Sequence, residues 1–397
     1  MVRDAGVRRR DLASLIAIVV LFNVGIMFLA LVVPIAALRL RLSPAALGLL
    51  VALPGVFLFV ARLFVGHAID RWGTRAVLRS GAVAFGVGAL VLLLWPGWPG
   101  LVVEQLLTGM GRAAFMPGTQ ARLYADGQAQ ERRVAAYNAS VGVGLTFGAA
   151  MAGLSLERSF TFARVALVAI ALLLGVGTLV LARDRPRDSS HAGGIASGLG
   201  LHLLPRLAPA CLLAFVAGLP FVLMSSFYPV WGHRIGIPLV WLGSLESLRG
   251  IATITAGLTF PWIVRRVGRR HLGELGLVCM AAAVGLTPLA RTAFHLGLDI
   301  ALANFVGAWV FNESTLRLLD AVPGSERGRA LSLTGSAWSL SLLLTPIGLG
   351  FAADALGIAA AFWTTAAFAL GCLALLQLPG PFGGPAALPA GGRRQQG

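Results

Sequence analysis

Two side chains that could carry a proton or bind an anion, Glu246 and Arg249, stand three residues apart in an apolar segment. That spacing places both on one face of a helix, where their charges can neutralise each other. A carboxylate beside a guanidinium and a wet cavity could also take up and release a proton. Counted at about 1.5 Å per residue from Pro238, they lie about 12 and 16 Å into the segment, near the middle of a bilayer core about 30 Å thick. An ionisable group at that depth normally faces a cavity or a partner.

A second arginine, Arg112, lies in another apolar segment and has no acid within one helical turn. Its partner must come from elsewhere: Glu246, Glu313 or an anionic group of a substrate, because a guanidinium suits carboxylate and phosphate. A tether to a backbone carbonyl or to another helix is the alternative. Glu313, near the inner end of its segment, is either a gate acid or an ion-pair partner for the arginines between 265 and 270.

Three further polar residues complete the candidate substrate or proton site. Asn23 and Asn304 fall at mid-depth, where an amide either hydrogen-bonds a neighbouring helix or contacts a ligand. Arg62 stands one turn from the inner end of its segment. There it either extends toward the lipid headgroups or supports the neighbouring loop.

No pattern typical of an enzyme accompanies these residues. The sequence has no lysine and so no phosphate-binding glycine loop with a lysine, no metal-ligand spacing among its 6 histidines, and no serine elbow. The 3 cysteines all stand in apolar runs, which offers neither a disulfide framework nor a thiolate metal site. We therefore expect no enzymatic activity, no metal and no cofactor, and a process driven by an ion or substrate gradient.

The segments that must position these side chains are membrane-spanning helices. The 397 residues are 57% hydrophobic and 12% charged, with a mean hydropathy of +0.83, whereas soluble proteins are about 25% charged. Apolar runs long enough to cross a bilayer predict an all-α polytopic membrane protein with 12 transmembrane helices. The expected spans are 12–38, 44–65, 77–95, 98–121, 134–154, 160–182, 207–231, 238–263, 272–290, 295–316, 330–352 and 357–378.

The basic residues predict the orientation of these spans. All 32 are arginine, and most of them lie in the tails and loops that share one side of the membrane. By the positive-inside rule that side is the cytoplasm, which places both termini there and the chain in the bacterial cytoplasmic membrane. The net charge of +16 is then a signal of topology, and we expect no nucleic-acid partner.

An internal repeat divides the chain into halves. Gly73 and Gly268 occupy matching places in similar loops, and the same shift of 195 residues carries Glu131 and Arg132 onto another acid and arginine pair. Because each half contains six spans and both halves keep the same orientation, the two bundles are parallel and related by a pseudo-two-fold axis along the membrane normal. We expect an N-terminal six-helix bundle at 1–183, a cytoplasmic central loop at 184–206, a C-terminal six-helix bundle at 207–380 and a cytoplasmic tail at 381–397.

The loop between the second and third spans reads Gly66-x-x-x-Asp70-Arg71-x-Gly73-x-Arg75 and resembles the loop signature of the major facilitator superfamily (MFS). Together with the twelve spans and the repeat, the resemblance covers almost the whole chain. It implies the MFS fold and assigns these five residues to a conformational latch that joins the halves in the outward-facing state. A structural reading of the same loop is a positive-inside turn with a capping aspartate.

This resemblance implies a secondary transporter that moves a small solute by alternating access, as a monomer in the lipid bilayer. We expect proton-coupled efflux of small amphipathic organic compounds, with Glu246 as the proton site tuned by Arg249 and Arg112. Uptake of a small organic or inorganic anion is the alternative, because Arg62, Arg112 and Arg249 outnumber the central acids. A non-transporting membrane receptor or scaffold is the alternative of another class.

Overall fold

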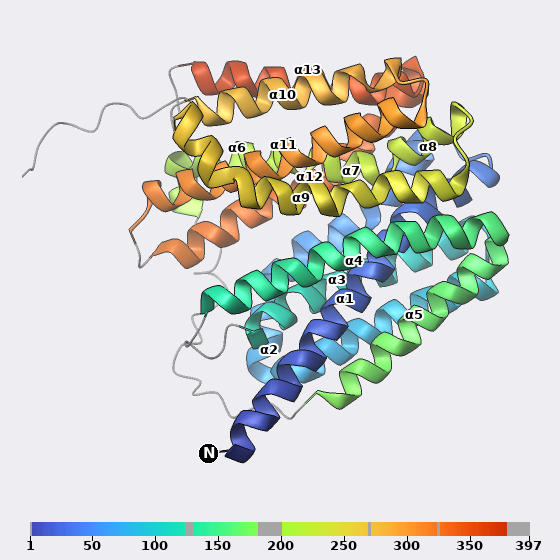
Figure 1. The fold of residues 1–397 in the computed structure, drawn as a ribbon, viewed down its shortest axis with the longest axis vertical. Helices are drawn as coiled ribbons and strands as arrows, with labels where there is room; N and C mark the ends of the chain where they lie inside the picture. The colour runs from blue at the N-terminus through green and yellow to red at the C-terminus, as the bar shows by residue number, and fades with distance from the viewer. Residues whose placement is uncertain (1, 124–129, 182–200, 269–270, 324–325, 379–397) are drawn as a thin grey trace, which may run out of the picture.

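A computed structural model describes residues 2–123, 130–181, 201–268, 271–323 and 326–378, and these residues form helices and short connections without strands. The first half contains five helices. They are α1 (Val2–Arg39), α2 (Pro44–Leu94), α3 (Trp98–Leu123), α4 (Gln130–Arg158) and α5 (Phe160–Val180). The second half contains α6 (Leu204–Ala217), α7 (Leu219–Met224), α8 (Phe227–Arg234), α9 (Leu239–Val267), α10 (Leu272–Leu286), α11 (Ala293–Ala321), α12 (Arg327–Leu356) and α13 (Ala359–Gln377). Figure 1 shows the two groups one above the other.

Helix α2 contains two membrane crossings joined at one residue. Gly73 has φ 81° and ψ 160°, which interrupts the helix, while the residues on both sides stay helical. The loop expected between 65 and 77 is therefore contracted to a kink. Only glycine adopts this backbone conformation without strain, because any side chain would clash with the main chain.

The seventh span predicted at 207–231 lies within an apolar segment long enough to cross a membrane, Leu204–Arg234, but the structure divides this crossing into α6, α7 and α8. The first interruption is at Gly218, two residues before Pro220, whose ring nitrogen cannot donate a helical hydrogen bond. The second is at Ser225 and Ser226, where Ser226 has φ −140° and ψ −75°. The short middle helix α7 lies at the centre of the protein and carries Phe221.

The repeat is visible in the backbone as well as in the sequence. Gly268 has φ 78° and ψ 149°, which nearly reproduces Gly73, 195 residues earlier. The same shift relates Arg41 (φ 54°) to Gly236 (φ 82°) in the loops that precede α2 and α9. Two loops with matching left-handed residues indicate that the halves share one topology.

The halves meet along two seams where glycines bring backbones together. At the first seam, α2 on α12, a Cβ placed on Gly48 would lie 2.9 Å from the Cα of Gly350. At the second, α4 on α9, a Cβ on Gly243 would lie 2.9 Å from the Cα of Gly153. Gly48 and Gly243 are again related by the shift of 195. The seams therefore follow the pseudo-symmetry of the repeat.

Both seams lie near the end of the bundle opposite the chain termini. Helix α1 begins and α13 ends at the left of Figure 1, where the two groups of helices diverge, and the groups converge at the right. Towards the diverging end of α9, Leu258 and Trp262 are 78% and 56% exposed. The halves are thus in backbone contact near one end, and their ribbons diverge toward the other.

Within the first half, the small residues of α4 serve packing. A Cβ on Gly144 would lie 2.7 Å from the carbonyl oxygen of Val20, so α4 approaches α1 at backbone distance. A Cβ on Gly148 would lie 2.9 Å from the Cα of Val24, so the Gly144 and Gly148 pair forms a helix-packing motif against α1.

Nine segments of the described chain are long and apolar enough to cross a membrane. The first part of α2, α3 and α9 fall short, and they complete the twelve crossings. Helices α3 and α9 fall short because they carry charged side chains at mid-length: Glu104 and Arg112 on α3, and Glu246 and Arg249 on α9. The structure therefore has to bury these charges between helices.

Candidate functional site

The structure brings together two arginines from opposite halves on one aromatic ring. The guanidinium carbon of Arg249 lies 3.9 Å from the centre of the Phe221 ring, and that of Arg112 lies 5.4 Å from the same centre. Arg249 also donates from Nη1 to the sulfur of Met27 on α1, at 3.5 Å. A guanidinium over an aromatic face is attracted by the negative face of the ring. Phe221, which the sequence analysis did not single out, is therefore central to this site.

Glu246 is 2% exposed, and neither of its carboxylate oxygens has a hydrogen-bond partner. Its spacing from Arg249 puts both residues on one side of α9, yet among the described residues no ion pair within 4.0 Å joins them. Glu246 lies midway between Gly243 and Gly250, and both glycines contact α4 across the second seam. The acid is consequently buried beside the contact between the two halves.

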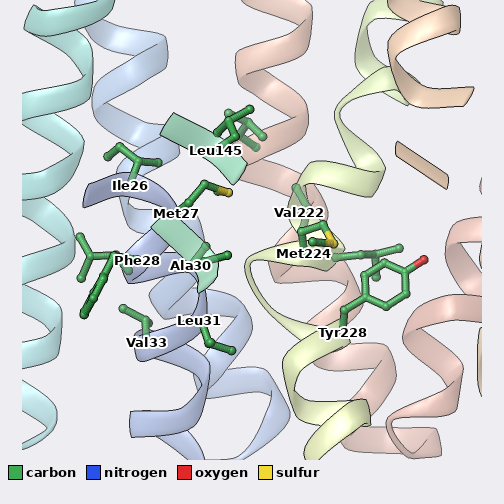
Figure 2. Close-up of a cluster of buried hydrophobic side chains, with 14 of the residues drawn as sticks. Ile26, Met27, Phe28, Ala30, Leu31, Val33, Leu145, Val222, Met224 and Tyr228 are labelled. Carbon is green, nitrogen blue, oxygen red and sulfur yellow. The ribbon is translucent and has the colours of Figure 1, made fainter. Parts of the chain in front are cut away.

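A cavity of about 40 Å³ lies between the halves at mid-depth. At ~10–15 Å³ for each water molecule, it has room for about three waters. Its polar side comes from Gln105, Thr108 and Arg112 of α3, and its opposite wall includes Phe221 of α7. The remaining lining is mostly apolar and includes Ile26, Met27, Leu29, Ala30 and Val33 of α1, Val51, Pro54 and Leu58 of α2, and Leu342 of α12. Figure 2 shows Met27 of α1 and Val222 of α7 facing each other across the centre of the protein.

A second buried acid, Glu104, lies directly behind the polar side of this cavity. Glu104 is fully buried and accepts hydrogen bonds from Thr108 Oγ1 at 2.6 Å and from Gln105 Nε2 at 2.7 Å. The sequence analysis did not select Glu104. The signal that could have found it is local, because a threonine four residues after an acid faces it on a helix. Its repeat counterpart on α11 is also an acid, Asp299, which is half-buried.

The two asparagines bond to their own helices. Asn23 Nδ2 donates to the carbonyl of Val19, and Asn304 Nδ2 donates to the carbonyl of Ile300, both at 2.8 Å. Neither residue lines the cavity. In this conformation both amides act within a single helix.

Glu313 pairs with an arginine one helical turn away. Its Oε1 accepts from Nε of Arg317 at 2.8 Å, within α11. The arginines at 265 and 266, which were candidate partners, are exposed, and residues 269–270 lie outside the described chain. Glu313 is thus part of the inner end of α11, away from the arginine pair on Phe221.

The latch residues are only partly described. The side chains of Arg62, Gly66 and Asp70 lie outside the described residues, and Arg71 is exposed. Arg75 Nη2 donates to the carbonyl of Leu179 at 3.3 Å. Cations at the last carbonyls of a helix satisfy free acceptors and favour the helix dipole. In this conformation Arg75 therefore ties α2 to the end of α5, inside the same half.

Comparison with known proteins gives the family. The model of the Major Facilitator Superfamily matches residues 13–319, and the chain belongs to that superfamily. It is a multi-pass membrane transporter of a small-molecule substrate and not an enzyme, and the expected MFS fold is confirmed.

Individual relatives are distant. Multidrug resistance protein 1 of Bacillus subtilis (strain 168) is 22% identical over 341 residues, which cover 83% of this chain and 87% of that protein. The solved nucleoside transporter NupG has a TM-score of 0.77 at 14% identity and covers 92% of this chain and 97% of its own. A bacterial homologue of the human lysosomal transporter Spinster, in an inward-facing and unoccupied conformation, has a TM-score of 0.74 at 16% identity, with coverages of 93% and 96%. At these identities the structural likeness establishes the fold alone.

Proposed function

We propose that this protein is a proton-coupled secondary transporter that exports small amphipathic organic compounds across the bacterial cytoplasmic membrane. It acts as a monomer by alternating access, with both termini in the cytoplasm. The observation that carries the proposal is the cavity between the halves, because it combines an apolar wall with one polar side at mid-depth. Pseudo-symmetric transporters bind their substrates at such an interface between repeats.

The seams support an inward-facing assignment for this conformation. Backbones are in contact near Gly48 and Gly243, at the end opposite the termini, and the halves diverge at the end that holds the termini. With the termini in the cytoplasm, the closed end faces outward. Access alternates when both seams open and the diverging ends come together.

Glu246 is the group we assign to proton coupling. It is buried at the second seam with two oxygens that lack hydrogen-bond partners. Taking up a proton would remove a buried charge, and burying an unpaired charge is costly. The loss or gain of that charge beside the seam can therefore bias the contact between the halves.

The lining of the cavity and the names of relatives both support the substrate class that we propose. Apolar side chains of α1 and α2 suit the hydrophobic part of an amphipathic compound, while Arg112 and the second N–H of Gln105 offer donors to its polar part. The relatives named multidrug resistance proteins favour export.

A transport measurement tests the proton role. Purified protein is reconstituted in liposomes, a pH gradient is imposed, and movement of an amphipathic fluorescent dye is followed. We expect Glu246→Gln to lose the acceleration by the pH gradient, while Glu157→Gln, a change at an exposed acid, keeps it. Unchanged dependence of Glu246→Gln on the gradient would refute the assignment.

Uptake of a small anion is the second candidate, and the observation in its favour is the arginine pair on Phe221. Right-side-out membrane vesicles distinguish the directions. Accumulation of a labelled organic acid inside them would support uptake, and exclusion of the dye would support export.

A further inference from the structure

We propose that the central cavity binds aromatic carboxylates, with the aromatic ring against Phe221 and α1. The carboxylate is held between Arg112, which lines the cavity, and Arg249, which contacts the Phe221 ring from outside the cavity lining. This inference names the substrate class and rests on the proposed transport function. It concerns binding, so it can be tested separately from the direction and the coupling of transport.

Both arginines carry N–H donors that no hydrogen bond uses among the described residues. A guanidinium carries five N–H donors and no acceptor. Among the described residues Arg112 donates no hydrogen bond, and Arg249 donates one, to the weak sulfur acceptor of Met27. No nitrogen of Arg112 or Arg249 is among the fully buried atoms without a partner in the described chain, so these donors keep some exposure and an acceptor can reach them. A carboxylate offers two oxygens that accept such donors in pairs.

The site carries two positive charges close to each other. The two guanidiniums come from opposite halves and share one ring, so their positive charges repel each other in the interior of the protein, where screening is weaker than in bulk water. Neither nearby acid neutralises them by contact. Glu246 makes no ion pair with Arg249 among the described residues, and Glu104 is hydrogen-bonded to Thr108 and Gln105. A bound anion would supply the missing negative charge.

The cavity that Arg112 lines has mostly apolar walls. A small inorganic anion would gain nothing from Ile26, Met27 and the other apolar side chains of α1, whereas an aromatic ring would bury its surface against them. Phe221 adds a ring for edge or offset stacking. The site therefore favours an organic anion with a flat apolar body over nitrate or chloride.

The present cavity is smaller than one aromatic ring, since it holds about three waters. Two of its walls can move. Met27 has a flexible side chain that adapts to irregular spaces, and Arg112 and Phe221 stand on different halves, so a change in the angle between halves alters their separation. We infer that the carboxylate takes the position between the guanidiniums as the ring displaces Met27.

The experiment compares 1-naphthoate with 1-naphthamide, which has the same ring without the charge, and with nitrate. Binding to the full-length protein in detergent is measured by calorimetry. We expect naphthoate to bind and the other two to bind at least 10-fold more weakly. Arg112→Gln and Arg249→Gln should each weaken naphthoate binding by about 10- to 150-fold, because a hydrogen bond to a charged group contributes about 1.5–3 kcal/mol. Arg206→Gln, a change at an exposed arginine, should leave it unchanged.

Controls separate this inference from folding and from transport. Gel filtration and thermal unfolding establish that each variant folds. Phe221→Leu keeps both arginines, so it should weaken acid and amide alike. Equal binding of naphthoate and naphthamide, or wild-type binding of naphthoate by both arginine variants, would overturn the inference. Dye transport without naphthoate binding would overturn the inference and leave the transport function standing, whereas naphthoate binding without any transport would refute the transport function alone.

Discussion

A single methyl group at the second seam should shift the protein toward its outward-open state. In Gly243→Ala, the added Cβ would lie 2.9 Å from the Cα of Gly153 and closer still to the carbonyl oxygen of Ala149. Both neighbours are backbone atoms, which cannot rotate away. The closed seam must therefore separate slightly, while a protein with an open seam accommodates the methyl group freely.

The magnitude follows from the cost of overpacking. One extra methyl group in a well-packed contact costs about 1–3 kcal/mol. Since 1.4 kcal/mol corresponds to about tenfold in an equilibrium constant, Gly243→Ala should favour the open seam by about 5- to 150-fold. The higher helix propensity of alanine applies to both states and cancels. Gly48→Ala at the first seam should act in the same direction, and the effects of two distant sites should add.

Spin-label distances measure this shift. Labels on cysteines at the exposed positions Arg158 and Arg234, which lie at the outer ends of α4 and α8, report the separation of the halves once the native cysteines are replaced. We expect a short distance in the parent protein and a new, longer distance in Gly243→Ala. Gly371→Ala is the matched control, because no atom lies within 4 Å of its Cβ position.

The predicted shift toward the open seam is refuted if Gly243→Ala and the double variant with Gly48→Ala give the same distance distribution as Gly371→Ala. It also fails if the added methyl groups lower thermal stability without populating a longer distance. In either case the glycines would be packing residues of a seam that does not open.

Three further predictions concern stability, measured by thermal unfolding in detergent. Gly73→Ala should cost about 1–3 kcal/mol, because φ 81° with ψ 160° is a backbone conformation that alanine rarely adopts; an effect no larger than that of Gly371→Ala would contradict this. Thr108→Val should cost about 1–3 kcal/mol by removing a donor from the buried Glu104 carboxylate, and the loss should nearly vanish in a Glu104→Met background; equal losses in both would rule out the hydrogen bond as the cause. Arg79→Gln should cost about 0.3–1 kcal/mol by uncapping α5, and Arg79→Lys less, so a reversed order would count against capping.

The candidate site was only partly predictable from the sequence. Arg112, Glu246 and Arg249 could be predicted as site residues because they are charged and stand in apolar segments. Charged side chains in apolar helices are costly and must be buried between helices. Depth in the membrane alone does not distinguish a residue that lines a cavity from one that bonds its own helix. Asn23 and Asn304 were therefore predicted as site residues together with the charged ones, although both bond to their own helices.

The positions of the breaks in the seventh span could not be predicted from the sequence, for a physical reason. Mean hydropathy over 204–234 is high, and a continuous helix satisfies the same pattern. Whether a proline and two serines bend or interrupt a helix depends on the neighbours that satisfy the freed backbone groups. At Gly218 the helix is closely packed, because a Cβ there would lie 2.7 Å from the side-chain oxygen of Ser341 on α12.

The sequence by itself determined the membrane class, the twelve spans and the repeat of two halves, because apolar length and charge placement are local properties. Only the tertiary structure decided which side chains meet. Arg112, Phe221 and Arg249 come from three helices and two halves, and their contacts depend on how the helices pack across more than 100 residues of chain. No local pattern encodes that packing, since it results from small residues at the seams and from the mutual fit of helices that are equally apolar.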